Sequence, residues 1–141
     1  MFKYLISIIF IFSLAPILGC ASQPGDLNAD LGQQISLKAG QTASINGEQL
    51  KIRFVEVVSD SRCPSNAVCI WAGEVTCTIE IIYNKALFRK TLVKSGGSPE
   101  FVNVDFTEYG IAFDVQPYPE AGKEIKKDEY QLKLKITKKP V

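Results

Sequence analysis

Apolar and polar side chains alternate over most of the chain after its N-terminal quarter, and this period of two predicts β-strands with one buried face. The first examples are QISLK at 34–38 and LKIRF at 50–54. Asn46-Gly47 lies between them, and this dipeptide favours a tight hairpin turn because both residues tolerate a positive φ. After the second segment the apolar phase moves to Val55 and Val57, which predicts either a β-bulge or a strand covered on both faces.

The middle of the chain carries two further strand patterns joined by a turn. EVTCTIEII at 74–82 alternates between an apolar and a polar face, and ALFRKTLV at 86–93 begins another short strand at Leu87 or Phe88. Asn84-Lys85 is predicted to turn the chain between them. The side of the first strand that we expect to be buried consists of Val75, Cys77, Ile79 and Ile81.

Three patterns of the same kind follow a break at SGGSP, residues 95–99. They are FVNVDF at 101–106, YGIAFDV at 109–115 and YQLKLKIT at 130–137, with proline and glycine at 117–122 before the last. The side chains of the last strand predicted to point inward are Tyr130, Leu132, Leu134 and Ile136. The lysines between them should face water, as a solvated face, as the protected edge of a sheet, or as a docking patch for an acidic partner.

Seven or eight short strands separated by turn signals predict an all-β domain. No window longer than a few residues has the spacing of an amphipathic helix. In a chain of this length the pattern is typical of an antiparallel β-sandwich of immunoglobulin-like proportions. A small closed β-barrel is the alternative architecture.

The N-terminal segment has the composition of an export signal. Lys3 precedes an apolar run from Leu5 to Leu18, which is shorter than the roughly 20 residues of a membrane-spanning helix. Its ending, Ile17-Leu18-Gly19-Cys20, resembles the lipobox of bacterial lipoproteins, in which the cysteine becomes the acylated N-terminus of the mature chain. We therefore expect residues 1–19 to be removed as a signal peptide and Cys20 to be lipidated, with an uncleaved anchor helix as the alternative.

The resemblance to lipoproteins also implies a location in the cell envelope. Several acyl chains hold a protein at a membrane permanently, whereas a single chain binds only marginally. Residues 20–33 are small and polar, so we expect them to form a lipidated flexible tether that leads to a folded domain at 34–141. By the lipoprotein sorting pattern, Ala21 and Ser22 imply the outer membrane of a double-membraned bacterium, at its periplasmic face or the cell surface. In a single-membraned bacterium the outer leaflet of that membrane is implied.

The charge balance bears on the class of partner. The chain has 16 basic and 15 acidic side chains, and removal of Lys3 with the signal peptide leaves it formally neutral. Binding to nucleic acid depends on a basic surface, so we expect no nucleic-acid partner. The chain also lacks a glycine-rich phosphate loop and a dinucleotide fingerprint, so we expect no cofactor.

The stretch DSRCPSNAVCIWAGEV at 60–75 poses the main chemical question, which is whether its cysteines form a disulfide or a metal or redox site. Exported chains meet oxidising surroundings, and the short loop from Cys63 to Cys69 can close without much strain. Such a ring stabilises the folded state by roughly 2 kcal/mol on the chain-entropy model. The chain has no histidine and no CxxC pair, and Met1 is its only methionine, which disfavours metal or redox chemistry. We therefore expect a Cys63–Cys69 disulfide and no metal site.

Two neighbouring residues have more than one interpretation. Cys77 is in phase with the buried positions of its strand, so we expect an inert buried thiol, with pairing to Cys63 or Cys69 as the alternative. Trp71 either packs over the disulfide or the sandwich edge, or stands beside Arg62 at the mouth of the loop as an aromatic anchor. Arg62 and Trp71 are therefore the candidate partner-binding residues.

The two halves of this stretch also carry a resemblance. Asp60-Ser61-Arg62-Cys63-Pro64 and Cys69-Ile70-Trp71-Ala72-Gly73-Glu74 are similar to a signature of small exported bacterial proteins, often lipoproteins, of uncharacterised function. The likeness extends from AGQTASI at 39–45 to the closing strand at 130–136, which is most of the mature domain. It carries no known activity, so it implies that the loop matters without assigning it a catalytic role.

The absence of histidine disfavours catalysis. The commonest general base is missing, and neither a Ser-His-Asp nor a Cys-His arrangement can form within the chain. We expect instead a membrane-anchored lipoprotein that is not an enzyme and that presents loops 59–73 and 117–127 to an envelope protein or glycan. The alternatives are a structural accessory subunit that pairs through an open strand edge, an inhibitor of a hydrolase, and a carrier of a small molecule or lipid.

Overall fold

The computed structural model describes residues 25–140, which form nine β-strands and contain no helix. The strands are β1 Leu27–Ala29, β2 Gln34–Lys38, β3 Thr42–Ile45, β4 Leu50–Asp60, β5 Glu74–Tyr83, β6 Ala86–Ser95, β7 Val102–Phe106, β8 Tyr109–Gln116 and β9 Gln131–Lys138.

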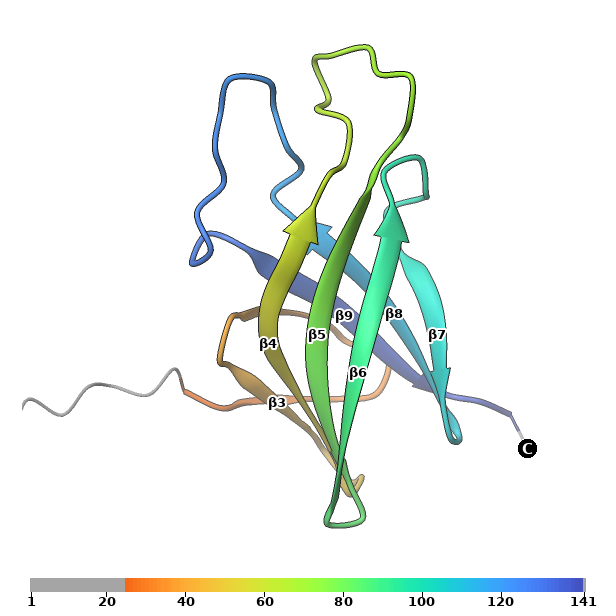
Figure 1. The fold of residues 1–141 in the computed structure, drawn as a ribbon. Helices are drawn as coiled ribbons and strands as arrows, with labels where there is room; N and C mark the ends of the chain where they lie inside the picture. Colours follow the sequence, from red (N-terminus) through yellow and green to blue (C-terminus); the bar gives the residue numbers. More distant parts are fainter. Residues whose placement is uncertain (1–24, 141) are drawn as a thin grey trace, which may run out of the picture.

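The strands form two sheets that pack face to face (Figure 1). One sheet has the strand order β1-β3-β4-β5-β6 and the other has the order β2-β9-β8-β7. Every neighbouring pair is antiparallel except β1 and β3, which are parallel. The predicted β-sandwich is confirmed, and the barrel alternative is wrong because the two sheets stay separate.

The core between the sheets follows the alternation of the sequence. On β5 the four predicted inward residues, Val75, Cys77, Ile79 and Ile81, are all buried. The same holds for Tyr130, which immediately precedes β9, and for Leu132, Leu134 and Ile136 on β9. Each large aliphatic side chain buried in this way stabilises the fold by about 1.5–3 kcal/mol relative to an exposed one, so the alternation itself selects the sandwich.

Two predicted turns have different outcomes. Asn84 and Lys85 have φ angles of 49° and 68° and join β5 to β6 directly, as a two-residue hairpin with both central residues at positive φ. At the other turn only Gly47 has a positive φ, and four residues separate β3 from β4. The turn is therefore where Asn46-Gly47 predicts it, but it is wider than a two-residue hairpin.

The strand that pairs with β4 across this turn is β3, which the alternation pattern did not single out. The segment 34–38 is β2 and lies in the opposite sheet, paired with β9. The phase change after Phe54 is a bulge, as one of the two interpretations predicted: the register with β5 shifts between Phe54 and Glu56 and again between Val57 and Ser59. Bulges increase the local twist of a strand, and here they precede the end of β4 at which the candidate site begins.

The folded domain begins earlier than residue 34. Within the expected tether, Leu27 packs against the core, Ala29 is buried and the backbone amide of Gly32 donates to the carbonyl of Ile136 (2.7 Å). The expected boundary is therefore wrong, because two apolar side chains and a parallel strand hold this segment to the first sheet. The predicted signal peptide at 1–19 and the lipidation site Cys20 lie outside the described residues. The described part of the chain contains no helix long and apolar enough to cross a membrane.

The position of β9 in its sheet excludes one interpretation of its lysines, that of a protected sheet edge. This strand lies between β2 and β8, so Lys133 and Lys135 do not protect a sheet edge. They are on the outer face of the second sheet, where Lys133 forms an ion pair with Glu100 (3.4 Å). A solvated face is the interpretation that agrees with this position.

Candidate functional site

The loop of residues 61–73, here called the stapled loop, joins β4 to β5 and projects from one end of the sandwich (Figure 1). Two backbone hydrogen bonds extend the hairpin into it, from Ser61 N to the carbonyl of Glu74 and from Cys63 N to the carbonyl of Ala72, both 2.8 Å. Above this stem the predicted disulfide joins Cys63 to Cys69, with their Cα atoms 5.9 Å apart. The staple prediction is confirmed, and the loop is closed at its base and again nearer its tip.

Gly73 is required by the geometry of the stem. Its φ is +67°, and a Cβ atom at this position would lie 1.8 Å from the carbonyl oxygen of Ser61. Any other residue would therefore push the two sides of the stem apart.

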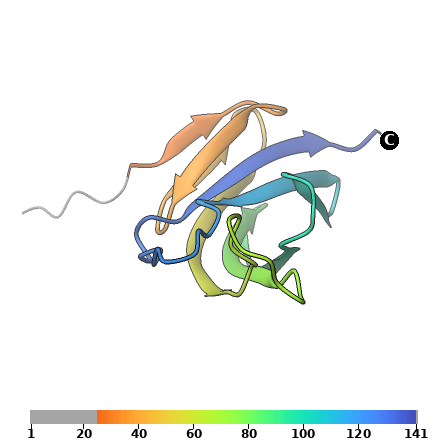
Figure 2. The same ribbon diagram turned by 90° about the horizontal axis from the view of Figure 1, so that it is seen from above.

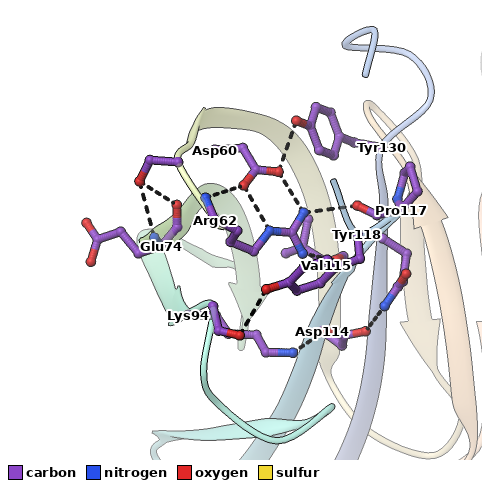
Figure 3. A network of polar contacts seen from close by, with 12 residues as sticks. Asp60, Arg62, Glu74, Lys94, Asp114, Val115, Pro117, Tyr118 and Tyr130 are labelled. Carbon is purple, nitrogen blue, oxygen red and sulfur yellow. Dashed lines mark hydrogen bonds and ion pairs between the residues drawn. The ribbon is translucent and has the colours of Figure 1, made fainter. Parts of the chain in front are cut away.

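Arg62 lies at the base of the stapled loop and is only 3% exposed. Its Nε donates to Oδ1 of Asp60 (2.8 Å) and its Nη2 to Oδ2 of the same carboxylate (2.6 Å), which makes a bidentate ion pair (Figure 3). Nη1 donates to the carbonyl of Val115 (2.8 Å), and Nη2 also donates to that of Pro117 (3.0 Å). The guanidinium thereby links the end of β4 in one sheet to the end of β8 in the other.

Two tyrosines complete the surroundings of this ion pair. The ring of Tyr118 lies over the guanidinium, with the Arg62 Cζ atom 4.8 Å from the ring centroid, and its hydroxyl donates to the carbonyl of Gly96 (3.0 Å). The hydroxyl of Tyr130 donates to Oδ2 of Asp60 (3.1 Å). We call Asp60, Arg62, Tyr118 and Tyr130 the arginine network.

The electrostatics of the arginine network favour a charged Asp60. Burial by itself would raise the pKa of Asp60, but the hydrogen bonds and positive charge of Arg62 outweigh it and hold that pKa below its ordinary value. Burial, together with the negative charge of Asp60, raises the pKa of Tyr130 to about 12. At neutral pH the network therefore holds an ionised carboxylate and a neutral phenol.

Arg62, one of the two candidate partner-binding residues, is buried and therefore does not present its side chain to a partner. Its Nε, Nη1 and Nη2 atoms donate to Asp60 and to two carbonyl oxygens between the sheets. One signal could have indicated this: an aspartate two residues before the arginine, at the end of a strand, can pair with it locally.

A second buried ion pair lies beside the network and was missed from the sequence. Lys94 on β6 pairs with Asp114 on β8, and both are buried. The lysine also donates to the carbonyl of Glu100 (2.7 Å), and Gln116 donates to the other oxygen of Asp114 (2.6 Å). Lys94 takes an inward position in an alternating strand, and the pattern gave no sign of its partner in the other sheet.

The stapled loop is held from both sides by other loops (Figures 1 and 2). On one side Ser65 N donates to the carbonyl of Pro119 (3.0 Å), and Asn66 Oδ1 accepts from Ala121 N (2.7 Å). On the other side Gly96 N donates to the carbonyl of Gly73 (2.9 Å). These contacts join 117–121 and 95–99 to the stapled loop, so the loop end of the sandwich is one connected structure.

The stapled loop carries three apolar side chains that face solvent. Val68, Ile70 and Trp71, here called the apolar tip, are all exposed, and Trp71 is 82% exposed. The interpretation in which Trp71 packs over the disulfide or the sandwich edge is therefore wrong. Residues 63–73 contain no charged side chain, so the apolar tip has no ionic group within its own segment.

Cys77 adds no reactive group to this surface. Cys77 is buried in the core without a disulfide partner, and burial raises the pKa of its thiol to about 12, so it stays protonated and inert. Among the residues that the structure describes, no three His, Cys, Asp or Glu side chains are grouped to hold a metal ion. One feature that the loop end offers to another molecule is the apolar tip, on a loop held by a disulfide and by hydrogen bonds.

Comparisons of the chain with models of known protein families, with curated proteins and with solved structures found no match.

Proposed function

We propose that this protein is a lipid-anchored, non-catalytic interaction module of the bacterial cell envelope and that the apolar tip is its contact surface. The observation that carries the proposal is the exposure of Val68, Ile70 and Trp71 on one loop. Single exposed apolar residues are common on proteins, but a group of them on one projection is typical of an interaction site. Their burial by a partner would contribute on the order of 5 kcal/mol before the costs of association.

The rigidity of the support strengthens this interpretation. Association costs free energy when a loop must be ordered, and a loop that is already ordered avoids much of that cost. The disulfide, the stem hydrogen bonds and the arginine network all hold the stapled loop in place. In this view Arg62 is a positioning residue and Trp71 is the anchor, because aromatic residues are enriched among those that dominate binding energy.

The alternative of an accessory subunit that pairs through a strand edge has a weaker basis. In the described residues four strands, β1, β2, β6 and β7, have one side without a neighbouring strand, and β6 is the longest of them. Arg89 and Lys90 occupy the middle of this edge, and charged residues on edge strands oppose the addition of another strand. The apolar tip has no such protection.

Site-specific cross-linking in cells tests the proposed function. A photoreactive amino acid replaces Ile70 in the full chain, and a second variant carries it at Leu87, which is 63% exposed on β6 at the opposite end of the first sheet. We expect cross-linked products in the envelope fraction from position 70 and none from position 87. Both positions are exposed and apolar, so the comparison separates a specific contact from general stickiness.

Two outcomes contradict the proposal. A reactive group at position 70 that gives no product when the envelope is intact would show that the apolar tip touches nothing. Equal products from positions 70 and 87 would show that the apolar tip is not the contact surface.

A further inference from the structure

We infer that the partner of the apolar tip is a lipid bilayer, and that Trp71 and its neighbours insert into the interface of the membrane that carries the protein's own anchor. The inference rests on the proposed function, because it takes lipid anchoring at Cys20 as its starting point. It adds the chemical class of the partner to the contact surface defined above.

The composition of the apolar tip fits a membrane interface. Tryptophan is enriched where the hydrocarbon of a bilayer meets its headgroups, and Ile70 and Val68 are aliphatic side chains suited to the hydrocarbon side. A charged group carried into this layer would oppose insertion, and residues 63–73 have none. The polar part of the loop is used elsewhere, since the amide of Ser65 and the side chain of Asn66 bond to 119–121.

The shape of the apolar tip also favours lipid over a protein pocket. The stapled loop projects beyond the strands (Figure 1). Its three apolar side chains are exposed. A protein partner must offer a cavity complementary to this shape, whereas a fluid bilayer accepts any small apolar projection. Short loops with exposed aromatic and aliphatic side chains therefore need no matching surface in order to insert.

The register of the strands puts the apolar tip within reach of the anchored membrane. Leu27 pairs with Ala43, which pairs with Ile52, so the chain enters β1 at the level of Ile52. Since β1 runs opposite to β4, it enters from the side of the stapled loop. The eight residues from Ile52 to Asp60 span about 26 Å along β4. The seven residues from Cys20 to Leu27 span at most about 25 Å when extended, which is less than the distance from Leu27 to the stapled loop beyond Asp60, so the apolar tip meets the bilayer when the long axis of the domain is tilted toward the membrane.

The anchor changes how strongly the apolar tip must bind. A domain joined to a membrane by a short chain meets that membrane at an effective concentration on the order of millimolar, so a weak second contact is populated. The adjoining loop carries both signs of charge, including the ion pair of Lys123 with Glu120. We therefore expect insertion to depend on apolar contact and to occur in zwitterionic membranes.

Fluorescence quenching tests the inference directly, because Trp71 is the only tryptophan of the chain. The acylated full chain is reconstituted into phosphatidylcholine vesicles whose acyl chains are brominated, and into matched vesicles without bromine. Bromine quenches an indole that it touches. We expect Trp71 emission to fall at least about twofold in the brominated vesicles and to be shifted to shorter wavelength in the unbrominated ones. Equal emission in both vesicles, at the wavelength of an indole in water, would overturn the inference.

A matched variant moves the reporter to the other end of the molecule. In Trp71→Phe combined with Leu87→Trp, the single tryptophan lies on β6 beside the Asn84-Lys85 turn, and we expect bromine to leave its emission unchanged. Quenching of equal size in this variant would contradict insertion by the apolar tip. If cross-linking at position 70 captures an envelope protein while bromine leaves Trp71 unquenched, the proposed function stands and this inference fails. If position 70 gives no product of any kind, the proposed function itself fails.

Discussion

The guanidinium of Arg62 and the carboxylate of Asp60, two residues earlier in the chain, form a bidentate ion pair in which the arginine side chain has no exposed surface. Arg62 also donates to the carbonyl of Val115 on β8 in the other sheet and to that of Pro117, just after β8. The two residues are close together in the sequence, and their hydrogen bonds hold the stapled loop to both sheets of the sandwich.

Removal of either partner of this pair should strongly destabilise the fold. We expect Asp60→Asn or Arg62→Met to lower the free energy of unfolding by about 3–5 kcal/mol. The first change leaves the buried charge of Arg62 without its partner, and the second leaves the buried acceptors of Asp60, Val115 and Pro117 unpaired. Denaturant titration measures the loss. Arg53 and Glu80 form a more exposed pair at 3.5 Å, and Arg53→Met should cost less than about 1 kcal/mol. Equal losses in the two variants would contradict the structural role of Arg62.

The lowered pKa of Asp60 predicts a loss of stability in acid. A carboxyl group whose pKa is lower in the folded state stabilises that state fully above its unfolded pKa, which is about 3.9. This contribution disappears as the pH falls through the folded pKa, below about pH 4. We expect the stability of the natural protein to fall more steeply from pH 5 to pH 2.5 than that of Asp60→Asn. Parallel pH profiles of the two proteins would show that Asp60 is not held charged by Arg62.

The stem of the stapled loop should not tolerate a side chain at Gly73. A Cβ atom there would clash with the carbonyl of Ser61, so we expect Gly73→Ala to cost well over the about 1 kcal/mol of an unfavourable φ alone. Gly122 is the matched control, because its φ is +82° and no atom lies within 4 Å of the position that an alanine methyl group would take. Thermal unfolding of Gly122→Ala should show only the smaller conformational cost, and similar losses at both positions would argue against the clash.

The three cysteines of the described residues should differ in reactivity. Cys63 and Cys69 are joined, and the Cys77 thiol is buried with a raised pKa. We expect an alkylating reagent to modify none of the three in the folded protein and Cys77 alone after unfolding without reductant. Mass spectrometry of the peptides identifies the labelled residue. Labelling of all three under those conditions would mean that the disulfide is absent.

The apolar tip should contribute to binding and hardly to stability. Trp71 is 82% exposed, so we expect Trp71→Ala to change the free energy of unfolding by less than about 0.5 kcal/mol. The same substitution should remove the cross-linked products at position 70. A large loss of stability would instead indicate that the indole packs against the domain.

The sequence predicts those parts of this fold that depend on neighbours along the chain. The inward residues of β5, such as Ile79, follow from alternation, and the Asn84-Lys85 hairpin follows from the φ angles that its residues tolerate. The Cys63–Cys69 disulfide follows from the expected export of the chain and from the cysteine spacing. β1 lies within the expected tether because three residues are too few to show a period, and its stability comes from pairing with β3.

The candidate site was only partly predictable for the same reason. The unusual composition of the stapled loop makes it a candidate site, and exposure of Trp71 is one of two interpretations of the sequence. The burial of Arg62 depends on carbonyl oxygens of Val115 and Pro117, more than fifty residues away, and no local pattern records them. The pairing of Lys94 with Asp114 likewise arises only when two sheets meet.

The placement of Cys77 within the core also bears on how the chain is oxidised. Three thiols can be joined in three ways, and two of those ways would trap the β4–β5 hairpin in a mispaired form. Once the two sheets have packed together, Cys77 is enclosed between them while Cys63 and Cys69 remain close together in one short ring. A chain that packs before it is oxidised can therefore form only the native pair, and such a chain needs no disulfide isomerase.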